Sequence, residues 1–275
     1  MENKTAFITG ASRGIGLATT IKFFNQGWNV IATMRNPTIK SNLLDDKRVL
    51  LAEVDVLNNE SIEQALKLGN QKFGSIDVVV NNAGFGSSGP LEATSVENIE
   101  KQYQVNVIGT LLVVRAALPY FRKQGRGTVC NISSMGGIVC FPFGALYNGS
   151  KFAIEGISEA LQYELREIGC RIKIIEPGAT STDFATSSFV LNNDETLREY
   201  QELVHKLLSF FESKGKESQS PELVAETIFK AATDDQDQLR YVVGNDAEFL
   251  IAQRNKLNDL DFREFLLSAF ESTTK

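Results

Sequence analysis

Residues 5–16 read TAFITGASRGIG, and this stretch decides the fold of the chain. A short β-forming run, TAFIT, ends at a loop that carries Gly10, Gly14 and Gly16, and a helical pattern occupies 14–27. Glycines permit a tight turn and a close approach of the backbone to a ligand, and the free amides at a helix N-terminus bind anions. A strand, a glycine loop and a helix in this order are typical of a diphosphate-binding turn; a glycine turn that binds nothing is the alternative.

Outward from this turn, β-forming runs alternate with helical patterns. Runs such as IDVVVNNAG at 76–84 are rich in valine and isoleucine, which is typical of strands buried on both faces. The alternation predicts an α/β fold, a Rossmann-type doubly wound parallel sheet of about seven strands with helices on both faces. A capping box of Thr94 and Glu97 is expected to begin a long helix that passes Pro119. The expected strands are 5–9, 28–34, 48–56, 76–84, 127–134, 170–178 and 240–244.

After residue 178 the alternation stops. Residues 179–219 are richer in Ser, Thr and Asn, with a helical stretch near 194–213. No linker interrupts the chain, so 1–275 is interpreted as a single domain with an insertion at about 179–219. Segments beyond the strand ends of an open α/β sheet often cover the ligand, so the insertion is predicted to be a mobile lid over an apolar pocket. Ordinary helix packing is the alternative for its apolar residues, which are Phe184, Phe189, Leu191, Leu203, Leu207, Leu208, Phe210 and Phe211.

Composition excludes several classes of protein. The net charge of −6 disfavours a nucleic-acid partner. The three cysteines are widely spaced and His205 is the one histidine, so no metal site and no disulfide framework is expected. No run approaches the length of about 18 apolar residues that a membrane span needs, and the N-terminus lacks a signal-peptide pattern. A cytoplasmic protein without a membrane span is therefore expected.

The end of the second strand indicates which dinucleotide would bind. An NAD-binding turn usually presents Asp or Glu about 20 residues further on, where it holds the ribose hydroxyls. Here Met34 takes that place and Arg35 follows it, while Arg13 lies within the glycine loop. Two guanidinium groups suit a 2′-phosphate, so NADP(H) is the predicted cofactor. The alternative is that both arginines are ordinary solvated surface residues.

The stretch ALYNGSKFAIEGI, residues 145–157, carries a second signal. Tyr147 and Lys151 lie one helical turn apart on the same face. The pair is either a solvated surface contact or the acid/base of an enzyme, because a positive charge near a phenol favours the phenolate and lowers its pKa. Ser133 and Ser134 end the fifth strand; they point to opposite faces, and strand geometry alone does not choose between them.

Five motifs appear in order along the chain: TGASRGIG (9–16), NNAG (81–84), NISS (131–134), YNGSK (147–151) and PGATST (177–182). Together they resemble the classical short-chain dehydrogenase/reductase family, over about residues 3–245. The IATMRNP stretch and the long insertion are similar to the hydroxysteroid- and retinol-dehydrogenase-like branch. One position departs from the family, because Gly149 stands where alanine is common. A glycine inside a helix costs about 0.5–1 kcal/mol relative to alanine.

The resemblance implies a role for each motif residue. Tyr147 would be the general acid/base, and Lys151 would bind the nicotinamide ribose and lower the pKa of the tyrosine. Ser134 would polarise the substrate carbonyl, and Asn106 would hold a water in the proton relay. The predicted catalytic residues are thus Ser134, Tyr147, Lys151 and Asn106. The predicted cofactor-binding residues are Gly10, Ser12, Arg13, Gly14, Ile15, Gly16, Arg35, Asp55, Val56, Asn82, Ala83, Gly84, Tyr147, Lys151, Pro177, Gly178, Thr180 and Thr182.

The expected function is that of an NADP(H)-dependent oxidoreductase that interconverts a ketone or aldehyde and an alcohol, with a hydrophobic small-molecule substrate. One alternative is a non-catalytic NADP(H)-sensing protein of the same fold, which would be expected to lose members of the Ser–Tyr–Lys set. Another is an NAD-dependent sugar-nucleotide epimerase or dehydratase, whose chains are usually longer and use another glycine spacing. The resemblance also implies a homodimer or homotetramer that pairs through the helices at about 95–122 and 147–169.

Overall fold

The computed structural model describes residues 3–37, 46–182, 188–215 and 218–272; the side chains of 211–215 and 271–272 are not described. Two of the predicted lid residues, Phe184 and the side chain of Phe211, therefore lie outside the described part.

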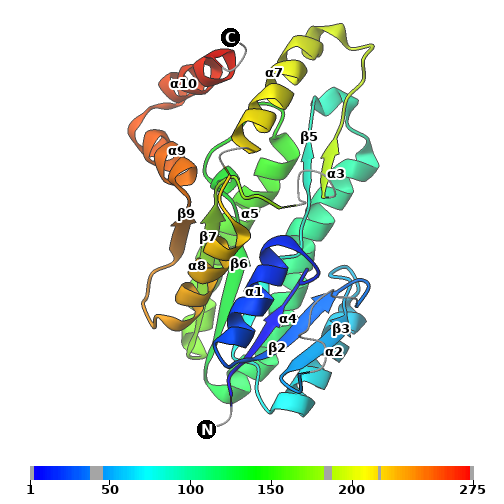
Figure 1. Ribbon diagram of the computed structural model, residues 1–275, viewed down its shortest axis with the longest axis vertical. Coiled ribbons are helices and arrows are strands. Elements are labelled where there is room, and N and C mark those ends of the chain that lie inside the picture. Colours follow the sequence, from blue (N-terminus) through cyan, green and yellow to red (C-terminus); the bar gives the residue numbers. More distant parts are fainter. Residues whose placement is uncertain (1–2, 38–45, 183–187, 216–217, 273–275) are drawn as a thin grey trace.

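A sheet of seven parallel strands forms the centre of the molecule (Figure 1). Its strand order is β3-β2-β1-β4-β6-β7-β9, so the chain moves outward from β1 in one direction and then, after β3, in the other. This confirms the predicted doubly wound fold, and each expected strand is found, with ends that differ by a few residues. The strands are β1 (Thr5–Ile8), β2 (Asn29–Met34), β3 (Val49–Glu53), β4 (Val78–Asn81), β6 (Gly127–Ile132), β7 (Cys170–Pro177) and β9 (Arg240–Val243).

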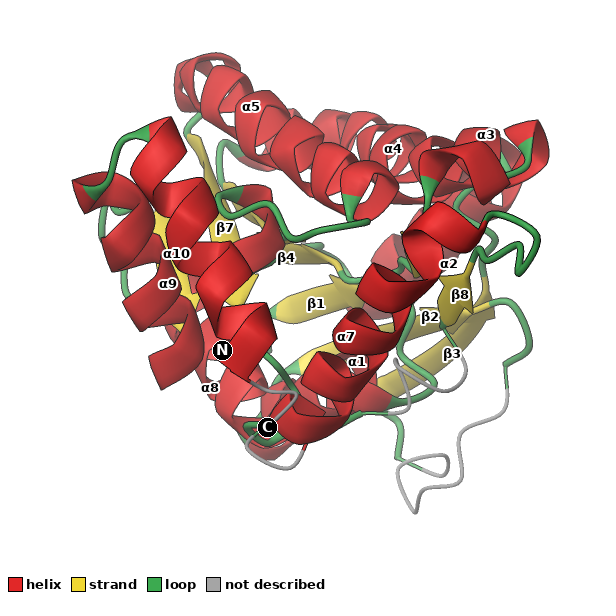
Figure 2. Cartoon of the chain, turned by 90° about the horizontal axis from the view of Figure 1, so that it is seen from above, coloured by secondary structure: helices red, strands yellow, loops and turns green. Residues whose placement is uncertain are grey.

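Helices cover both faces of the sheet, as the view from above in Figure 2 shows. On one face, α1 (Gly14–Asn25) packs against α8 (Pro221–Thr233), and Phe23, Trp28 and Ile228 join the core beneath them. The opposite face is covered by α2 (Asn59–Phe73), α4 (Gly109–Gln124) and α5 (Ala145–Glu167). Because both faces are covered, alternate side chains of each central strand enter separate cores, which explains the continuous apolar runs in the sequence.

The insertion forms structure of its own above the sheet. A second, two-stranded parallel sheet pairs β5 (Gly86–Ser88) with β8 (Phe189–Leu191). The helix α7 (Arg198–Gly215) follows, in agreement with the helical stretch expected near 194–213. Two C-terminal helices, α9 (Asn245–Lys256) and α10 (Asp259–Ser272), complete the chain, and α10 contacts α7. Their contact includes the rings of Phe210 and Phe270, which are tilted by 42° with centroids 4.4 Å apart.

The long helix before β6 differs from its prediction at its start. Ser95, and not Thr94, is its N-cap, and the Ser95 side chain accepts a hydrogen bond from Asn98 N. The Thr94 hydroxyl instead donates to Pro90 O, because a short 3-10 turn at Leu91–Ala93 places it one residue too early to cap the helix. The helix then runs through α3 (Val96–Tyr103), a π-helical turn (Gln104–Ile108) and α4.

Among the described residues, one helix is long and apolar enough to cross a membrane by length and composition alone, and it is this one, Val96–Gln124. Glutamine, asparagine and threonine interrupt its apolar run, which is why no candidate span was expected from the sequence. Val113, Ala117 and Phe121 are fully buried against the sheet. The helix therefore has the packing of a core helix.

Candidate active site

The predicted site residues gather at the carboxyl edge of the parallel sheet. β1 lies between β2 and β4, and the chain leaves β1 toward β2 but leaves β4 toward β6. The loops after β1 and β4 therefore diverge, and in doubly wound sheets this switch point is where ligands bind. The glycine loop follows β1, and Asn82, Ala83 and Gly84 follow β4.

The glycine loop packs so closely against its neighbours that a side chain at Gly16 would not fit. A Cβ on Gly16 would collide with Gly10 O and the Asn82 side chain, and Gly10 has a positive φ of 65°. Within the described residues, α1 has no side-chain cap hydrogen bond and no acid in its first turn. The amides at the start of α1 are thus presented to a ligand, which is the arrangement that binds a diphosphate. These residues fit a dinucleotide.

Residues after β4 hold the glycine loop in place. The Asn82 amide donates to Thr9 O at 2.9 Å and to Gly10 O at 3.1 Å. The Thr9 hydroxyl accepts from Asn82 N and Ala83 N, both at 3.0 Å. Asn82 and Ala83 therefore fix the floor of the site, and Gly84 lies close to the Asn106 side chain.

Ser134, Tyr147 and Lys151 come together at the same edge. Ser134 follows β6, and its hydroxyl lies close enough to the Tyr147 side chain for a hydrogen bond. Lys151 Nζ lies 5.7 Å from the centre of the Tyr147 ring and donates to Ile132 O at 2.8 Å. Of the two adjacent serines, Ser134 faces Tyr147, while Ser133 faces Glu155. The structure thus separates the two serines that the sequence left open.

Burial shifts the pKa of both members of the Tyr147–Lys151 pair. Burial raises the pKa of Tyr147, and only the hydrogen bond from Ser134 opposes this effect. Burial also lowers the pKa of Lys151, to about 8, while the charge of Glu155 acts in the opposite direction. Desolvation of the phenol thus outweighs the hydrogen bond from Ser134, and the lowering of the Tyr147 pKa by Lys151 that the resemblance implies stays a prediction.

Asn106 lies in the π-helical turn and is 3% exposed. Its side chain bonds the backbone of Phe85 twice, accepting from Phe85 N at 3.1 Å and donating to Phe85 O at 2.9 Å. It also donates to Ser150 Oγ at 3.1 Å. Asn106 and the fully buried Ser150 thus join α5, the helix before β6 and the loop after β4. π-Helical turns inside longer helices are frequent at functional sites.

The predicted cofactor residues surround the rest of this edge. Arg35 is exposed directly after the buried Met34, at the carboxyl end of β2. Asp55 and Val56 follow β3, and the Asp55 carboxylate accepts from Leu57 N at 2.9 Å. Arg13 reaches the insertion, where its guanidinium donates to Ser188 Oγ at 2.8 Å. The exposed Ser12 and the partly buried Ile15 complete the loop.

The segment after β7 lies against the glycine loop. Pro177 is buried, and a Cβ added to Gly14 would lie 3.2 Å from the Thr182 side chain. The Thr180 hydroxyl donates to Gly178 O at 3.0 Å. The first residues of the insertion thus lie against the loop that follows β1.

Two supporting residues were not anticipated from the sequence. The buried Asn148 donates to Gly136 O and Val139 O and accepts from Phe141 N, so it binds the loop before α5 beside Tyr147. Asp246 accepts from Ala179 N at 2.7 Å and so anchors the start of the insertion. An asparagine next to the tyrosine is the only signal that the sequence offers for the first, and none marks the second.

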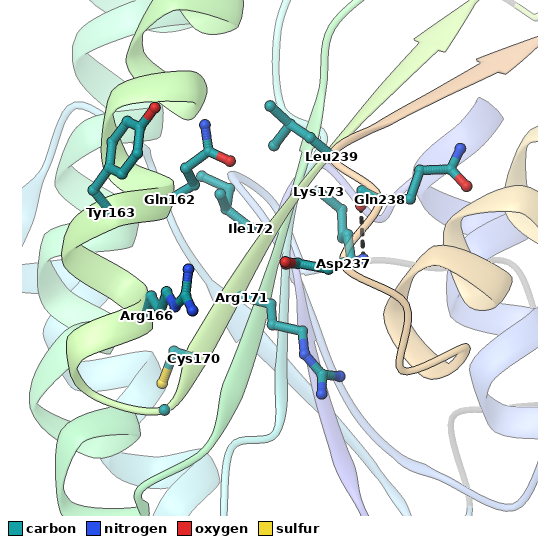
Figure 3. A pocket seen from close by; sticks show the side chains of 11 residues that line it. Gln162, Tyr163, Arg166, Cys170, Arg171, Ile172, Lys173, Asp237, Gln238 and Leu239 are labelled. Carbon is teal, nitrogen blue, oxygen red and sulfur yellow. Dashed lines mark hydrogen bonds between the residues drawn. The ribbon is translucent and has the colours of Figure 1, made fainter.

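A pocket of about 330 Å³ lies elsewhere (Figure 3). It is formed by the C-terminal part of α5 with Tyr163 and Arg166, the first residues of β7, and Asp237–Leu239 before β9. Lys173 points to the backbone of Gln238, with which it bonds at 2.7 Å. Because β7 begins here, this pocket opens at the amino edge of the sheet, opposite Tyr147, and is distinct from the candidate site.

The family model described as short chain dehydrogenase matches residues 4–190. The chain belongs to the short-chain dehydrogenase family. Among curated relatives of this family member, an uncharacterized oxidoreductase of Schizosaccharomyces pombe is 42% identical over 229 residues, 83% of this chain and 96% of the relative. A 3-ketodihydrosphingosine reductase of Bacteroides thetaiotaomicron is 31% identical over 270 residues, 98% of each chain.

Solved structures agree with this membership. A short-chain dehydrogenase from Streptomyces avermitilis superposes with a TM-score of 0.82 at 28% identity, covering 100% of this chain and 98% of the other. ElxO with NADP bound superposes with a TM-score of 0.70 at 25% identity, covering 88% of this chain and 98% of the other. This short-chain dehydrogenase family member is thus an oxidoreductase by family, with an NAD(P)-binding fold.

Proposed function

We propose that this short-chain dehydrogenase is an NADP(H)-dependent enzyme that interconverts a ketone or aldehyde and an alcohol. The observation that carries the proposal is the alignment of Ser134, Tyr147 and Lys151 at the sheet edge where the glycine loop also lies. A protein that only senses the cofactor does not need a hydroxyl, a phenol and an ammonium brought together. The intact set therefore favours catalysis.

The three side chains divide the chemistry of the carbonyl oxygen. When bound, NADP(H) supplies or accepts the hydride. In reduction, Tyr147 donates a proton to the oxygen; in oxidation, it takes the hydroxyl proton. Ser134 directs its hydroxyl to the same oxygen and stabilises the negative charge that develops there. Lys151 places its ammonium behind the tyrosine, and Asn106 holds the π-helical turn against the loop after β4.

NADP(H) is preferred to NAD(H) because of the residues after β2. No carboxylate stands at Met34, and the exposed Arg35 and Arg13 offer two guanidinium groups for a 2′-phosphate. The start of α1 and the loop residues Gly10 and Gly16 would hold the diphosphate. NADP in the related ElxO structure supports the same preference.

The substrate is proposed to be hydrophobic, with the insertion at about 179–219 as its lid. The ring of Tyr200 on α7 packs edge-on against Phe143, with 6.1 Å between centroids, and Phe143 lies just before α5. Val204 and Leu207 bury the inner face of α7. The Bacteroides relative, by its name, reduces a 3-keto compound, which supports a ketone as the substrate class.

Turnover of a panel of hydrophobic ketones with NADPH, followed by absorbance of the reduced nicotinamide, tests the proposal. We expect Tyr147→Phe to lower kcat by at least about 10²–10⁴-fold, because it removes the acid/base. NADPH affinity should change little in this variant. Full activity in Tyr147→Phe would refute the mechanism, and NADPH binding without turnover of any carbonyl by the wild type would favour a sensing role.

We also propose a homodimer or homotetramer in the cytoplasm. The family resemblance implies contacts through the helices at 95–122 and 147–169, and the exposed Phe152 and Tyr163 on α5 suit such a contact. Cys130, Cys140 and Cys170 are free thiols, which suits a reducing compartment. Light scattering of the purified protein measures the assembly directly, and a monomer at micromolar concentration would contradict it.

A further inference from the structure

A buried acidic pair lies behind Lys151, and the roles proposed above do not use it. Glu155 follows Lys151 by one turn of α5 and is 5% exposed, and Glu176 near the end of β7 is 1% exposed. Glutamates are rarely buried to this degree unless they are paired. The two carboxyl groups lie side by side, because Arg240 Nε is within 3.5 Å of an oxygen of each. Two adjacent carboxyl groups resist ionising together, so the pair holds one proton below neutral pH.

Arg240 is the cation that faces this pair. Its Nε lies 3.0 Å from Glu155 Oε2 and 3.5 Å from Glu176 Oε1, and its Nη2 contacts the half-exposed Glu159 at 2.7 Å. One guanidinium thus serves three carboxyl groups, which leaves an excess of negative charge unless a proton is bound. Glu176 Oε1 has no hydrogen-bond donor from the described residues, and a proton shared with Glu155 would supply one.

The shared proton exchanges near neutral pH. Burial and then the charge of Glu155 raise the pKa of Glu176 to about 7, against the opposing charge of Arg240. Burial also raises the pKa of Glu155, while the neighbouring Ser133 hydroxyl, the hydrogen bond from Arg240, and the charges of Arg240 and Lys151 lower it. Below this range the pair carries one negative charge; above it, the pair carries two.

The pKa of Lys151 responds to the charge of this pair. Its ammonium is desolvated, and the Glu155 charge is what raises the pKa of the amine against burial. We propose that Glu155 and Glu176 are positioning residues that share a proton and keep Lys151 charged behind Tyr147. The catalytic meaning of this inference rests on the proposed function, but the charge of Lys151 is measurable without turnover. The charged groups around the pair are Lys151 and the exposed Glu159 on α5 and Arg240 on β9, and Glu159 contacts the arginine.

The test titrates Lys151 in the full chain by NMR, with lysine labelled with ¹³C at Cε and the signal assigned by its loss in Lys151→Met. Glu155→Gln removes the carboxylate one helical turn from Lys151, so the amine should bind its proton about tenfold more weakly. Glu176→Gln mimics the protonated acid, so the Lys151 signal should match the low-pH wild type and no longer respond to the pair through neutral pH. Glu159→Gln removes an exposed carboxylate from the same arginine and should leave the titration unchanged.

An unchanged Lys151 titration in Glu155→Gln and Glu176→Gln, with thermal unfolding showing intact folds, overturns the inference. If Glu155→Gln fails to fold, the response of Glu176→Gln decides alone. Ketone reduction by NADPH, measured against pH, then separates the two proposals. Turnover with an unmoved Lys151 titration contradicts this inference only, whereas a shifted titration in a protein without turnover contradicts the proposed function only.

Discussion

At the residue scale, burial of the Lys151 amine lowers the stability of the folded chain, although the site is proposed to need this residue. Burial lowers its pKa from 10.5 to about 8, so between these values the unfolded chain binds a proton that the folded chain has released. Stability therefore rises with pH across this window. The destabilising effect of the lysine is fully present below about pH 8 and is gone above the pKa of the unfolded chain. A residue kept at this cost is expected to serve the site.

We expect Lys151→Met to raise the free energy of unfolding at pH 7 by about 1–3 kcal/mol, because methionine removes a buried ammonium while keeping an apolar chain. The gain should shrink as pH rises from 8 toward 10.5, and turnover should be lost. Urea unfolding of the wild type and of Lys151→Met at pH 7 and at pH 10 measures the gain in the free energy of unfolding at each pH. Lys67→Met, at an exposed position on α2, is the control; the same pH-dependent gain there would contradict the explanation.

Gly149, which departs from the family pattern, has a structural reason. A Cβ at this position would lie 2.5 Å from the Tyr103 hydroxyl. We expect Gly149→Ala to stabilise the protein by about 0.5–1 kcal/mol in a Tyr103→Phe background, where helix propensity acts without the contact. The gain should be smaller with Tyr103 present, because its hydroxyl must move. A double-mutant cycle of chemical unfolding measures the coupling, and equal gains in both backgrounds would exclude it.

At the element scale, the central sheet could be predicted because burial on both faces leaves continuous apolar runs. The pairing of β5 with β8 could not, because GSS at 86–88 has the composition of a loop and its partner Phe189–Leu191 follows about a hundred residues later. Such non-local pairing leaves no periodic signal in a three-residue strand. The N-cap at Ser95 was missed for a similar reason, since the preceding 3-10 turn has no distinct pattern.

In the candidate site too, residues related by local spacing could be predicted, whereas residues brought together from different elements could not. The motifs identified Tyr147 and Lys151, whose spacing of one helical turn is a local property. Strand geometry alone could not separate Ser134 from Ser133; the resemblance favoured Ser134, and the folded chain sets Ser134 beside Tyr147 and Ser133 beside Glu155. Glu155 and Glu176 belong to different elements, and the register of β7 against β9 brings Arg240 to them. The direction of the Tyr147 pKa depends on burial, which a sequence does not quantify.

The insertion depends on one buried residue, Asn192. Its amide donates to Ser87 Oγ at 2.7 Å and its oxygen accepts from Asn98 at 2.8 Å. We expect Asn192→Ala to loosen the β5–β8 pair by about 1–3 kcal/mol, because it leaves buried polar partners unsatisfied. Amide hydrogen exchange of β5 and β8 should then accelerate by at least about tenfold. Asn193→Ala, at an exposed neighbouring position, should change it little; equal acceleration in both would contradict the anchoring role.

At the scale of the whole molecule, the parallel sheet collects remote segments at one edge. The glycine loop, Arg35 and the segment after β7 come from the first, second and sixth strands of the main sheet, yet all reach the carboxyl side. A ligand that touches them all binds the folded chain and not the unfolded one. Binding of such a ligand therefore raises the free energy of unfolding, and the cofactor that binds more tightly raises it more at the same concentration.

This linkage gives a test of cofactor choice that needs no substrate. At a free concentration of about 100 Kd, a ligand adds about 2.7 kcal/mol to the free energy of unfolding. For a domain of this size we expect NADPH to raise Tm by about 5–10 °C, and NADH at the same concentration to raise it less. Arg35→Ala should remove most of this difference, because in the proposed site the guanidinium binds the 2′-phosphate that NADH lacks. Arg166→Ala makes the same charge change at the opposite edge of the sheet and should preserve it. Equal shifts with NADPH and NADH in the wild type would exclude the phosphate-binding role of Arg35.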